Sequence, residues 1–312
     1  MVVESSGRMA DAILEIEGLT KRFGRRVAVD GLSLRVERGD VFGFLGPNGA
    51  GKTTTIRMVT GLIRPNGGQI VVDGIRLRRH RRRALRKIGA LVETPAFHPH
   101  LSARTNLAAF ASLSGRVNRQ ELDDALEVVG LLARADDKVK AYSHGMKQRL
   151  GIACALVPRP ELLVLDEPST GLDPHGIKEV RDLIGALARE LGVTVFVSSH
   201  ILSEVEQMCG RVAIIDHGRL VTQGTIDELR SAEPVVTFGV DRVADAKALI
   251  EAKLGLAVLS TNETELRLTL PHERIADVNA ALVGAGVRVH AIVPQRQSLE
   301  DLFIQLTEKS IR

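Results

Sequence analysis

A glycine-rich segment at residues 46–53 constrains the fold of this chain more than any other stretch. It reads Gly-Pro-Asn-Gly-Ala-Gly-Lys-Thr and fits the pattern G-x-x-x-x-G-K-[ST] at every required position. The apolar residues 41–45 precede it, and residues 54–59, which we predict to be helical, follow it. Strand, loop and helix in this order are typical of a phosphate-binding loop. A glycine-rich turn that binds nothing would not need Lys-Thr directly after its glycines.

The chemistry of this loop follows from its backbone and its last two side chains. Glycines let successive N–H groups point inward at polyphosphate oxygens, and the N-terminus of the next helix adds a favourable dipole. Lys52 is expected to reach the β- and γ-phosphates, and Thr53 to hold Mg²⁺. The predicted nucleotide-binding residues of this segment are Gly46, Pro47, Asn48, Gly49, Ala50, Gly51, Lys52, Thr53 and Thr54.

Two other segments are predicted to be strands of the same sheet. Residues 161–167 form a continuous apolar run that ends in two acids, and residues 193–200 form a second such run. Runs of this kind are typical of strands buried on both faces of a parallel sheet. Ligands bind at the carboxyl ends of such strands, so we expect these ends to form one site with the loop.

The side chains at these strand ends suit nucleotide hydrolysis, which needs positioning, charge neutralisation and an oriented water. Asp166 is expected to complete the Mg²⁺ shell, and Glu167 to polarise the attacking water. His200 is expected to contact the γ-phosphate. A lone histidine is more often structural, but its place at this strand end favours a functional role. The predicted catalytic residues are therefore Glu167 and His200.

Length and composition fit one large domain followed by a smaller one. The chain has 312 residues, 44% of them hydrophobic, and it contains no uninterrupted apolar stretch long enough to cross a bilayer. We therefore expect another polypeptide to do any membrane spanning. The balance of 42 basic against 38 acidic residues does not imply nucleic acid. Cys154 and Cys209 lack metal-ligand spacing and are interpreted as buried thiols of a reducing compartment.

A basic run at residues 76–87 has two interpretations. It contains eight arginine or lysine residues and no acid. It is either a patch for nucleic acid or acidic lipid, or a solvated helix face that precedes the next strand. The absence of interleaved aromatic residues favours the solvated face, with proximity to a membrane surface as the remaining alternative.

Segments on either side of these strands complete the predicted organisation. Residues 13–17 and 27–36 alternate as β-structure, and residues 101–134 have helical periodicity, with Ser102 as the expected N-cap. Ser143 is expected to open a further helix. From residue 226 onward the order strand, helix, two strands, helix, strand suggests a ferredoxin-like α+β domain, followed by a helix at residues 299–306. The predicted parts are a tail at 1–11, a nucleotide-binding domain at 12–225 and an accessory domain at 226–312.

Four ordered motifs narrow the family. Residues 165–174 read Leu-Asp-Glu-Pro-Ser-Thr-Gly-Leu-Asp-Pro, and residues 143–148 read Ser-His-Gly-Met-Lys-Gln. Together with residues 46–53 and His200, they make residues 12–225 resemble the ATP-binding subunit of an ATP-binding cassette (ABC) transporter. The resemblance implies an α/β P-loop ATPase domain with a mixed sheet core, an antiparallel β subdomain and a helical subdomain. It also implies ATP and Mg²⁺ as cofactors.

The resemblance assigns roles to residues outside the loop. Phe23 matches the aromatic that stacks on adenine, although an ordinary hydrophobic residue at a strand end is a serious alternative. Ser143, Gly145 and Met146 lie in the segment that contacts the γ-phosphate held by the opposite subunit. The chain is therefore expected to form a homodimer, or to pair with a homologous subunit. Residues 169–173 resemble the loop that links the two sites across that dimer.

Two positions depart from the family pattern. Glu93 stands where the family usually has glutamine at the end of a strand, and it is expected to join Thr53 and Asp166 as a metal ligand while adding charge. His144 replaces the first glycine of the family motif. Residues 93–97 and 142–151 resemble most closely the bacitracin and lantibiotic export branch of the family.

The expected function is an ATPase that powers a separate membrane permease, exporting an antibiotic, drug or peptide. Such a subunit is expected in the cytoplasm, on the inner face of the membrane through its permease, without nucleic acid. The alternative is a soluble ABC ATPase that acts on ribosomes or DNA, but neither a long coiled-coil insertion nor a second cassette occurs. A GTPase or a small-molecule kinase is not supported, because the chain contains no Asn-Lys-x-Asp guanine motif. Either class would also leave residues 143–148 unexplained. The C-terminal domain is interpreted as dimer support, regulation or structural capping.

Overall fold

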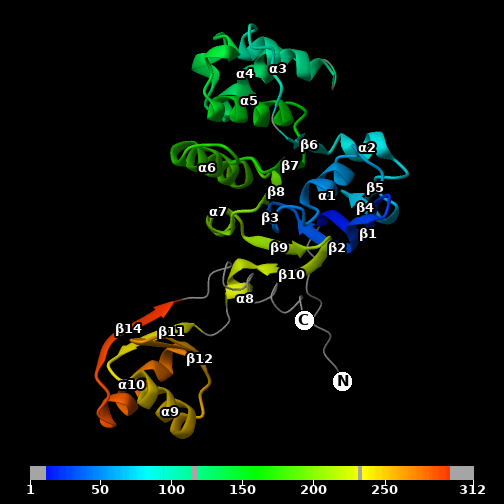
Figure 1. Cartoon of the computed structure of the whole chain (residues 1–312). Helices are drawn as coiled ribbons and strands as arrows, with labels where there is room; N and C mark the ends of the chain where they lie inside the picture. Colours follow the sequence, from blue (N-terminus) through cyan, green and yellow to red (C-terminus); the bar gives the residue numbers. More distant parts are fainter. Residues whose placement is uncertain (1–11, 94, 114, 116–117, 231–233, 296–312) are drawn as a thin grey trace, which may run out of the picture. The chain divides into compact units, whose positions relative to one another are not determined.

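The computed structural model describes residues 12–93, 95–113, 115, 118–230 and 234–295 (Figure 1). The chain divides into two compact units, Met1–Thr225 and Ile226–Arg312. The predicted tail at residues 1–11 and the helix predicted at 299–306 lie outside the described residues.

A six-stranded sheet forms the centre of the first unit, in the order β10-β9-β3-β8-β7-β6. Its strands are β3 (Val41–Leu45), β6 (Ile88–Leu91), β7 (Leu162–Asp166), β8 (Thr194–Ser199), β9 (Arg211–Asp216) and β10 (Arg219–Thr225). All adjacent pairs are parallel except β9 and β10, which form an antiparallel hairpin. Every residue of β7 and β8 is buried, which confirms the prediction from their continuous apolar runs.

An antiparallel sheet packs against the same core. It consists of β1 (Ala12–Phe23), β2 (Arg26–Glu37), β4 (Gly67–Val72) and β5 (Ile75–Arg76), in the order β2-β1-β4-β5. Ile16 of β1 shares one buried cluster with Phe42 of β3 and Phe196 of β8. The two phenyl rings are stacked, with centroids 5.8 Å apart. The predicted mixed sheet core and antiparallel β subdomain are thus confirmed.

Four helices of the first unit pack beside the strands of the two sheets. They are α1 (Lys52–Val59), α2 (Arg81–Leu85), α6 (Pro174–Leu191) and α7 (Leu202–Met208). The longest, α6, begins because Asp173 Oδ1 accepts a hydrogen bond from the N–H of Gly176 at 2.7 Å and Pro174 fits the first helical position. It ends at Gly192, whose φ of 64° suits glycine.

A helical subdomain contains α3 (Ala103–Ser112), α4 (Arg119–Val128) and α5 (His144–Leu156), which lie together at one end of the first unit (Figure 1). Ser102 and Ser143 cap α3 and α5 as predicted. The helical region predicted at residues 101–134 is not continuous, because Asn118 starts a new helix with a capping box to Glu121. A 3-10 turn at Leu132–Arg134 completes it.

The second unit begins with α8 (Ile226–Arg230) and confirms the predicted ferredoxin-like order. Its other elements are β11 (Val235–Val240), α9 (Val243–Leu254), β12 (Val258–Thr261), β13 (Glu265–Thr269), α10 (Ile275–Gly284) and β14 (Val289–Gln295). The strands pair antiparallel in the order β12-β13-β11-β14. Phe238, Ile250 and Leu282 join the sheet and its two helices in one core. Among the described residues, no helix has both the length and the hydropathy needed to span a membrane.

Candidate nucleotide site

The sheet order brings three strand ends together. In the parallel register, Leu45 of β3 pairs with Ser199 of β8, and Ser198 of β8 pairs with Asp166 of β7. The phosphate-loop segment, His200 and Glu167 therefore leave the sheet at the same edge. This is the edge where a parallel sheet binds its ligands.

The glycines of the loop permit a backbone that other residues would obstruct. Gly49 and Gly51 have φ angles of 86° and 108°. A Cβ atom on Gly46 would lie 2.4 Å from the carbonyl oxygen of Ile215, and one on Gly51 would lie 2.6 Å from that of Ala28. Gly51 is also the N-cap of α1, so no side-chain cap hydrogen bond is formed at this end of the described helix. Its first N–H groups are available to phosphate oxygens.

Lys52 places a buried positive charge in this loop. Its side chain is 5% exposed, and Nζ donates to the carbonyl oxygens of Gly46 at 2.7 Å and Pro47 at 3.3 Å. Nζ also lies 3.4 Å from Oε1 of Glu167. The lysine thus connects the loop after β3 with the acid after β7.

A cavity of about 320 Å³ opens at this place. The predicted site residues that line it are Phe23, Asn48, Gly49, Gly51, Lys52, Thr53, Thr54 and Glu167. Phe23 is half-exposed at the end of β1, with Nζ of Lys21 5.1 Å from its ring centroid. Gly46 and Ala50 are buried beneath the loop, and Pro47 is exposed. The structure therefore gathers the predicted loop residues, Phe23 and Glu167 around one cavity; their roles in binding stay predictions.

Arg26 also lines this cavity, and the sequence did not lead us to it. Its Nη2 atom lies 4.0 Å from the position of a Cβ atom built on Gly49. The guanidinium group adds positive charge beside Lys52 and suits phosphate oxygens. The signal in the sequence is a basic residue three positions after Phe23, at the first position of β2.

The two acids after β7 are held in different ways. Asp166 is buried, and its Oδ1 accepts a hydrogen bond from Oγ of Ser198 at 2.6 Å. The same Oγ accepts from the N–H of Glu167 at 3.0 Å. Ser198 was not predicted as a site residue, and its bridging role depends on the register of β7 and β8. It fixes both acids against the neighbouring strand.

Glu167 is the centre of the polar contacts at the site. Its backbone has a φ of 48°, in the left-handed region that non-glycine residues rarely adopt. Its Oε2 accepts from Oγ1 of Thr170 at 3.1 Å and lies 3.1 Å from Nδ1 of His200. With Lys52 on Oε1, three side chains orient this carboxylate. A positioned carboxylate is what activation of a water molecule requires.

The residues predicted to hold Mg²⁺ fit that ion in part. The hydroxyl of Thr53 and the carboxylate of Asp166 are oxygen donors, and Mg²⁺ is usually held by one or two carboxylates with phosphates and waters. No cluster of three or more His, Cys, Asp or Glu side chains able to hold a metal occurs in the described part of the chain.

Glu93 is turned towards another partner. It lies two residues beyond β6 with a φ of 66°, its side chain is 61% exposed, and its carboxylate pairs with Arg57 of α1. The residue that departs from the family's glutamine therefore contacts the helix that follows the phosphate loop. Its role as a metal ligand stays a prediction.

The residues expected to meet the second nucleotide lie elsewhere. Oγ of Ser143 accepts from the N–H of Met146 at 3.2 Å at the start of α5. Nε2 of His144 lies 3.4 Å from the carbonyl oxygen of Thr170, so this substituted residue contacts the loop after Glu167. Ser143, Gly145 and Met146 are not among the residues that line the 320 Å³ cavity of the same chain.

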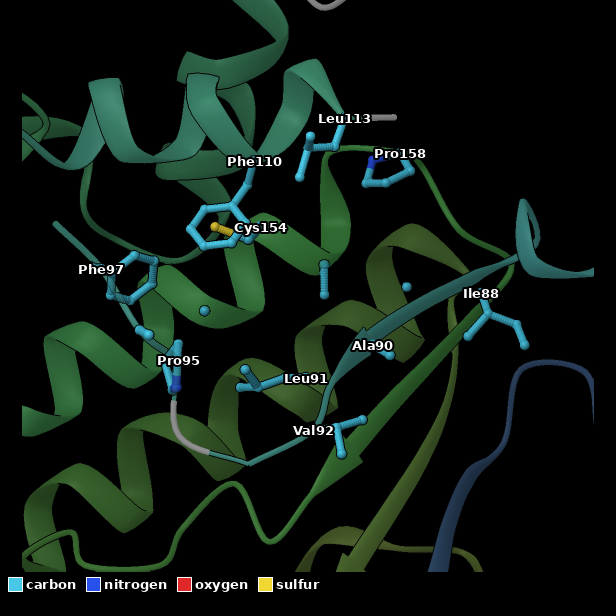
Figure 2. A pocket seen from close by; sticks show the side chains of 14 residues that line it. Ile88, Ala90, Leu91, Val92, Pro95, Phe97, Phe110, Leu113, Cys154 and Pro158 are labelled. Atoms are coloured by element: carbon cyan, nitrogen blue, oxygen red, sulfur yellow. The ribbon is translucent and has the colours of Figure 1, made fainter. Parts of the chain in front are cut away.

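A separate groove of about 450 Å³ lies between β6 and the helical subdomain (Figure 2). Figure 2 shows Phe97, Phe110 and Cys154 gathered beside the strand that carries Ala90 and Leu91. The two phenyl rings meet edge to face, with centroids 5.9 Å apart. We define this feature as the apolar groove; Leu113 and Pro158 line its far end.

The cysteine prediction needs one correction. Both Cys154 and Cys209 are free thiols, and Cys209 is buried as expected. Cys154 is only half-buried, because its position on α5 faces the apolar groove and not the core. Burial still raises the pKa of its thiol to about 12, so it is protonated at neutral pH.

A phosphate-binding loop after β3, with an acid pair after β7, the next strand but one in the same parallel sheet, defines a P-loop nucleotide hydrolase. A sequence model of the ABC transporter family matches residues 29–170. The Bacillus subtilis (strain 168) protein "Uncharacterized ABC transporter ATP-binding protein YhcH" is 41% identical over 95% of this chain and 96% of its own length. The Bacillus licheniformis protein "Bacitracin transport ATP-binding protein BcrA" is 42% identical over 94% and 97%.

A solved structure agrees with these relatives. The "Structure of ATP binding subunit of ABC transporter" is 30% identical, covers 70% of this chain and 92% of its own, and has a TM-score of 0.62. This chain belongs to the ATP-binding proteins of the ABC transporter family. It is an ATPase, and the resemblance to the export-type branch is confirmed.

Proposed function

We propose that this chain binds and hydrolyses ATP to power a separate membrane permease that exports an antibiotic, drug or peptide. The similarity to a bacitracin transport ATP-binding protein over nearly the whole length supports the cargo class. The observation that carries the proposal is structural. One chain presents a loop, a lysine and an oriented carboxylate around a cavity, while the start of α5 lies outside that cavity.

In the proposed reaction, the N–H groups of the loop, Lys52 and Arg26 bind the phosphates and neutralise their charge. Thr53 and Asp166 would hold Mg²⁺, and the bound ion would supply positive charge to the phosphate oxygens. Glu167 accepts a proton from the attacking water, and His200 positions Glu167 and contacts the γ-phosphate. Phe23, at the rim of the cavity, stacks on the base.

A second copy of the chain, or a homologous subunit, completes the site in this proposal. The start of α5 carries Ser143, Gly145 and Met146, and a helix N-terminus favours phosphate. A head-to-tail pair places this helix start of one copy against the nucleotide in the loop of the other. The symmetry of such a dimer gives two equivalent sites.

The apolar groove is the surface we assign to the permease. The side chains that line it are apolar, with Phe110 40% exposed and Leu113 84% exposed, which suits a partner with an apolar helix or loop. Val92 lines the groove, and the next residue, Glu93, pairs with Arg57 of α1. A partner that contacts Val92 in the groove would therefore lie next to Glu93, the residue that contacts α1 after the phosphate loop. Through this partner the chain works on the inner face of the membrane.

Isolation of the chain from membranes tests the proposal. We expect a tagged chain to co-purify with a membrane protein, and the reconstituted pair to hydrolyse ATP faster in the presence of its cargo. Phe110→Asp should abolish co-purification and leave ATP binding unchanged, whereas Leu259→Asp, at an exposed leucine of the second unit, should leave both unchanged. A chain that instead stays with ribosomes or DNA at moderate salt would favour the alternative class of soluble ABC ATPases.

A further inference from the structure

The basic run at residues 76–87 forms one exposed surface of the first unit. We define the arginine surface as Arg76, Arg78, Arg79, Arg81, Arg82, Arg83 and Arg86, all of which are exposed. They lie on the short edge strand β5, on α2 and in the turns that flank α2. The nucleotide cavity does not include any of them.

Little acidic charge compensates this surface. The run at residues 76–87 contains no acid. Within the described residues, ion pairs to the run are recorded only for Lys87, which binds Asp73 and Glu161. These two acids also bind Arg38. The arginine surface thus presents concentrated positive charge, which attracts polyanions or a negatively charged surface.

An exposed leucine lies beside this charge. Nη2 of Arg81 donates to the carbonyl oxygen of Gly61 at 2.7 Å, and the next residue, Leu62, is 63% exposed. An apolar side chain next to arginines is the combination that proteins use at a lipid headgroup layer. Nucleic-acid surfaces instead interleave aromatic residues for stacking on bases, and residues 76–87 contain none.

The arginine surface also adjoins the apolar groove. The residues that line a neighbouring cavity of about 640 Å³ include Arg82, Arg86, Ile88, Leu113 and Pro158, together with the charged residues Glu121 and Arg159. Ile88, Leu113 and Pro158 also line the apolar groove. The charge is therefore on the same side of the unit as the surface that we assign to a membrane-embedded partner.

We propose that the arginine surface binds anionic lipid headgroups of the membrane in which the permease is embedded. The position of the membrane in this inference rests on the proposed function. The choice of anionic lipid as the ligand rests on the charge of the arginine surface and on the exposed Leu62. The surface orients the ATPase against the bilayer and raises its local concentration near the permease. Each arginine near an anionic membrane contributes about a fivefold increase in affinity, and the effect is screened by salt.

The test is sedimentation of the full chain with phosphatidylcholine vesicles that contain or lack phosphatidylglycerol. We expect binding only to vesicles with phosphatidylglycerol, and weaker binding as salt rises. The combined variant Arg78→Gln, Arg79→Gln and Arg83→Gln should lose about fivefold in affinity for each charge removed. Replacement of the same three residues by lysine should preserve most of the binding, because the charge is kept.

A matched control removes three exposed charges elsewhere, with Lys140→Gln, Lys178→Gln and Arg189→Gln. An equal loss in this control, binding to pure phosphatidylcholine, or tighter binding to duplex DNA than to phosphatidylglycerol at the same salt would overturn the proposal. Both triple variants should keep their ATPase rate in solution and their co-purification with the permease in detergent. These two readouts report on the proposed function separately from lipid binding.

Discussion

Nζ of Lys52 lies 3.4 Å from Oε1 of Glu167, so the phosphate-binding lysine and the proposed base of hydrolysis neutralise each other. The lysine is buried and the carboxylate is a quarter exposed. When polyphosphate enters the loop, its negative charge competes with Glu167 for the ammonium group. We therefore expect binding of the substrate to release the carboxylate for contact with the attacking water.

Glu167→Gln should separate binding from hydrolysis. The amide keeps the size of the side chain and its contacts with Thr170 and His200, but it cannot accept a proton. We expect ATP affinity to be unchanged or raised, because Lys52 loses its competitor, and turnover to fall by about 10²- to 10⁴-fold. Equilibrium binding and steady-state phosphate release measure the two effects. Undiminished hydrolysis would contradict the assignment of Glu167.

Lys52→Ala should act on binding itself. The change removes the charge that faces the phosphates and leaves the Glu167 carboxylate without its cation. We expect ATP affinity to fall by about tenfold to a hundredfold, the range for loss of a charged hydrogen bond. A fluorescent ATP analogue titrated against both chains gives the ratio. Lys178→Ala on α6 is the matched control, and equal affinities for wild type and Lys52→Ala would argue against the phosphate loop.

Ser198→Ala should destabilise the acid pair. Oγ of Ser198 donates to Asp166 and accepts from the N–H of Glu167, and the serine is buried. Its removal leaves a buried donor and a buried acceptor without this partner, at a cost of about 1–3 kcal/mol in the free energy of unfolding. Urea denaturation measures the cost, with the exposed Ser112→Ala as control. We also expect a higher Mg²⁺ requirement, and a variant as stable as wild type would refute the bridging role.

An ion-pair cluster predicts how stability depends on pH. A hydrogen bond from Lys87 lowers the pKa of Asp73 from 3.8, and hydrogen bonds from Lys87 and Arg38 lower the pKa of Glu161 from 4.5. Because these pKa values are lower in the folded chain, the carboxylates stabilise it above 3.8 and 4.5, and the stabilisation is lost as pH falls through the lowered values. Glu161→Gln should therefore lower the urea midpoint at neutral pH and have little effect below that window. An equal effect at both pH values would contradict the cluster's role.

Much of the fold followed from local signals in the sequence. The continuous apolar runs predicted β7 and β8, since only strands covered on both faces tolerate them. Asp173 and Pro174 at the start of α6 and Gly192 at its end are local signals of the same kind. In these elements the residues that determine the structure are neighbours in the chain.

The missed features depend on residues that are distant in sequence. Ser198 bridges the two acids only because β7 and β8 are in register, and Arg26 reaches the loop only because the turn after β1 lies over it. The pairing of Glu93 with Arg57 requires that β6 end beside α1. The partial exposure of Cys154 likewise depends on the groove between two subdomains. Local sequence patterns carry no information about such contacts.

Cross-linking between two copies of the chain tests the central claim most directly. Cys154 and Cys209 are first replaced by alanine, and a copy with Asn48→Cys in the exposed part of the loop is then mixed with a copy carrying Ser143→Cys. We expect mild oxidation to join the two copies when ATP is present and not in its absence. Ser112→Cys in place of Ser143→Cys should give no product. Failure of the two copies to cross-link, although the Asn48→Cys copy still binds ATP, would contradict a nucleotide site shared between two chains.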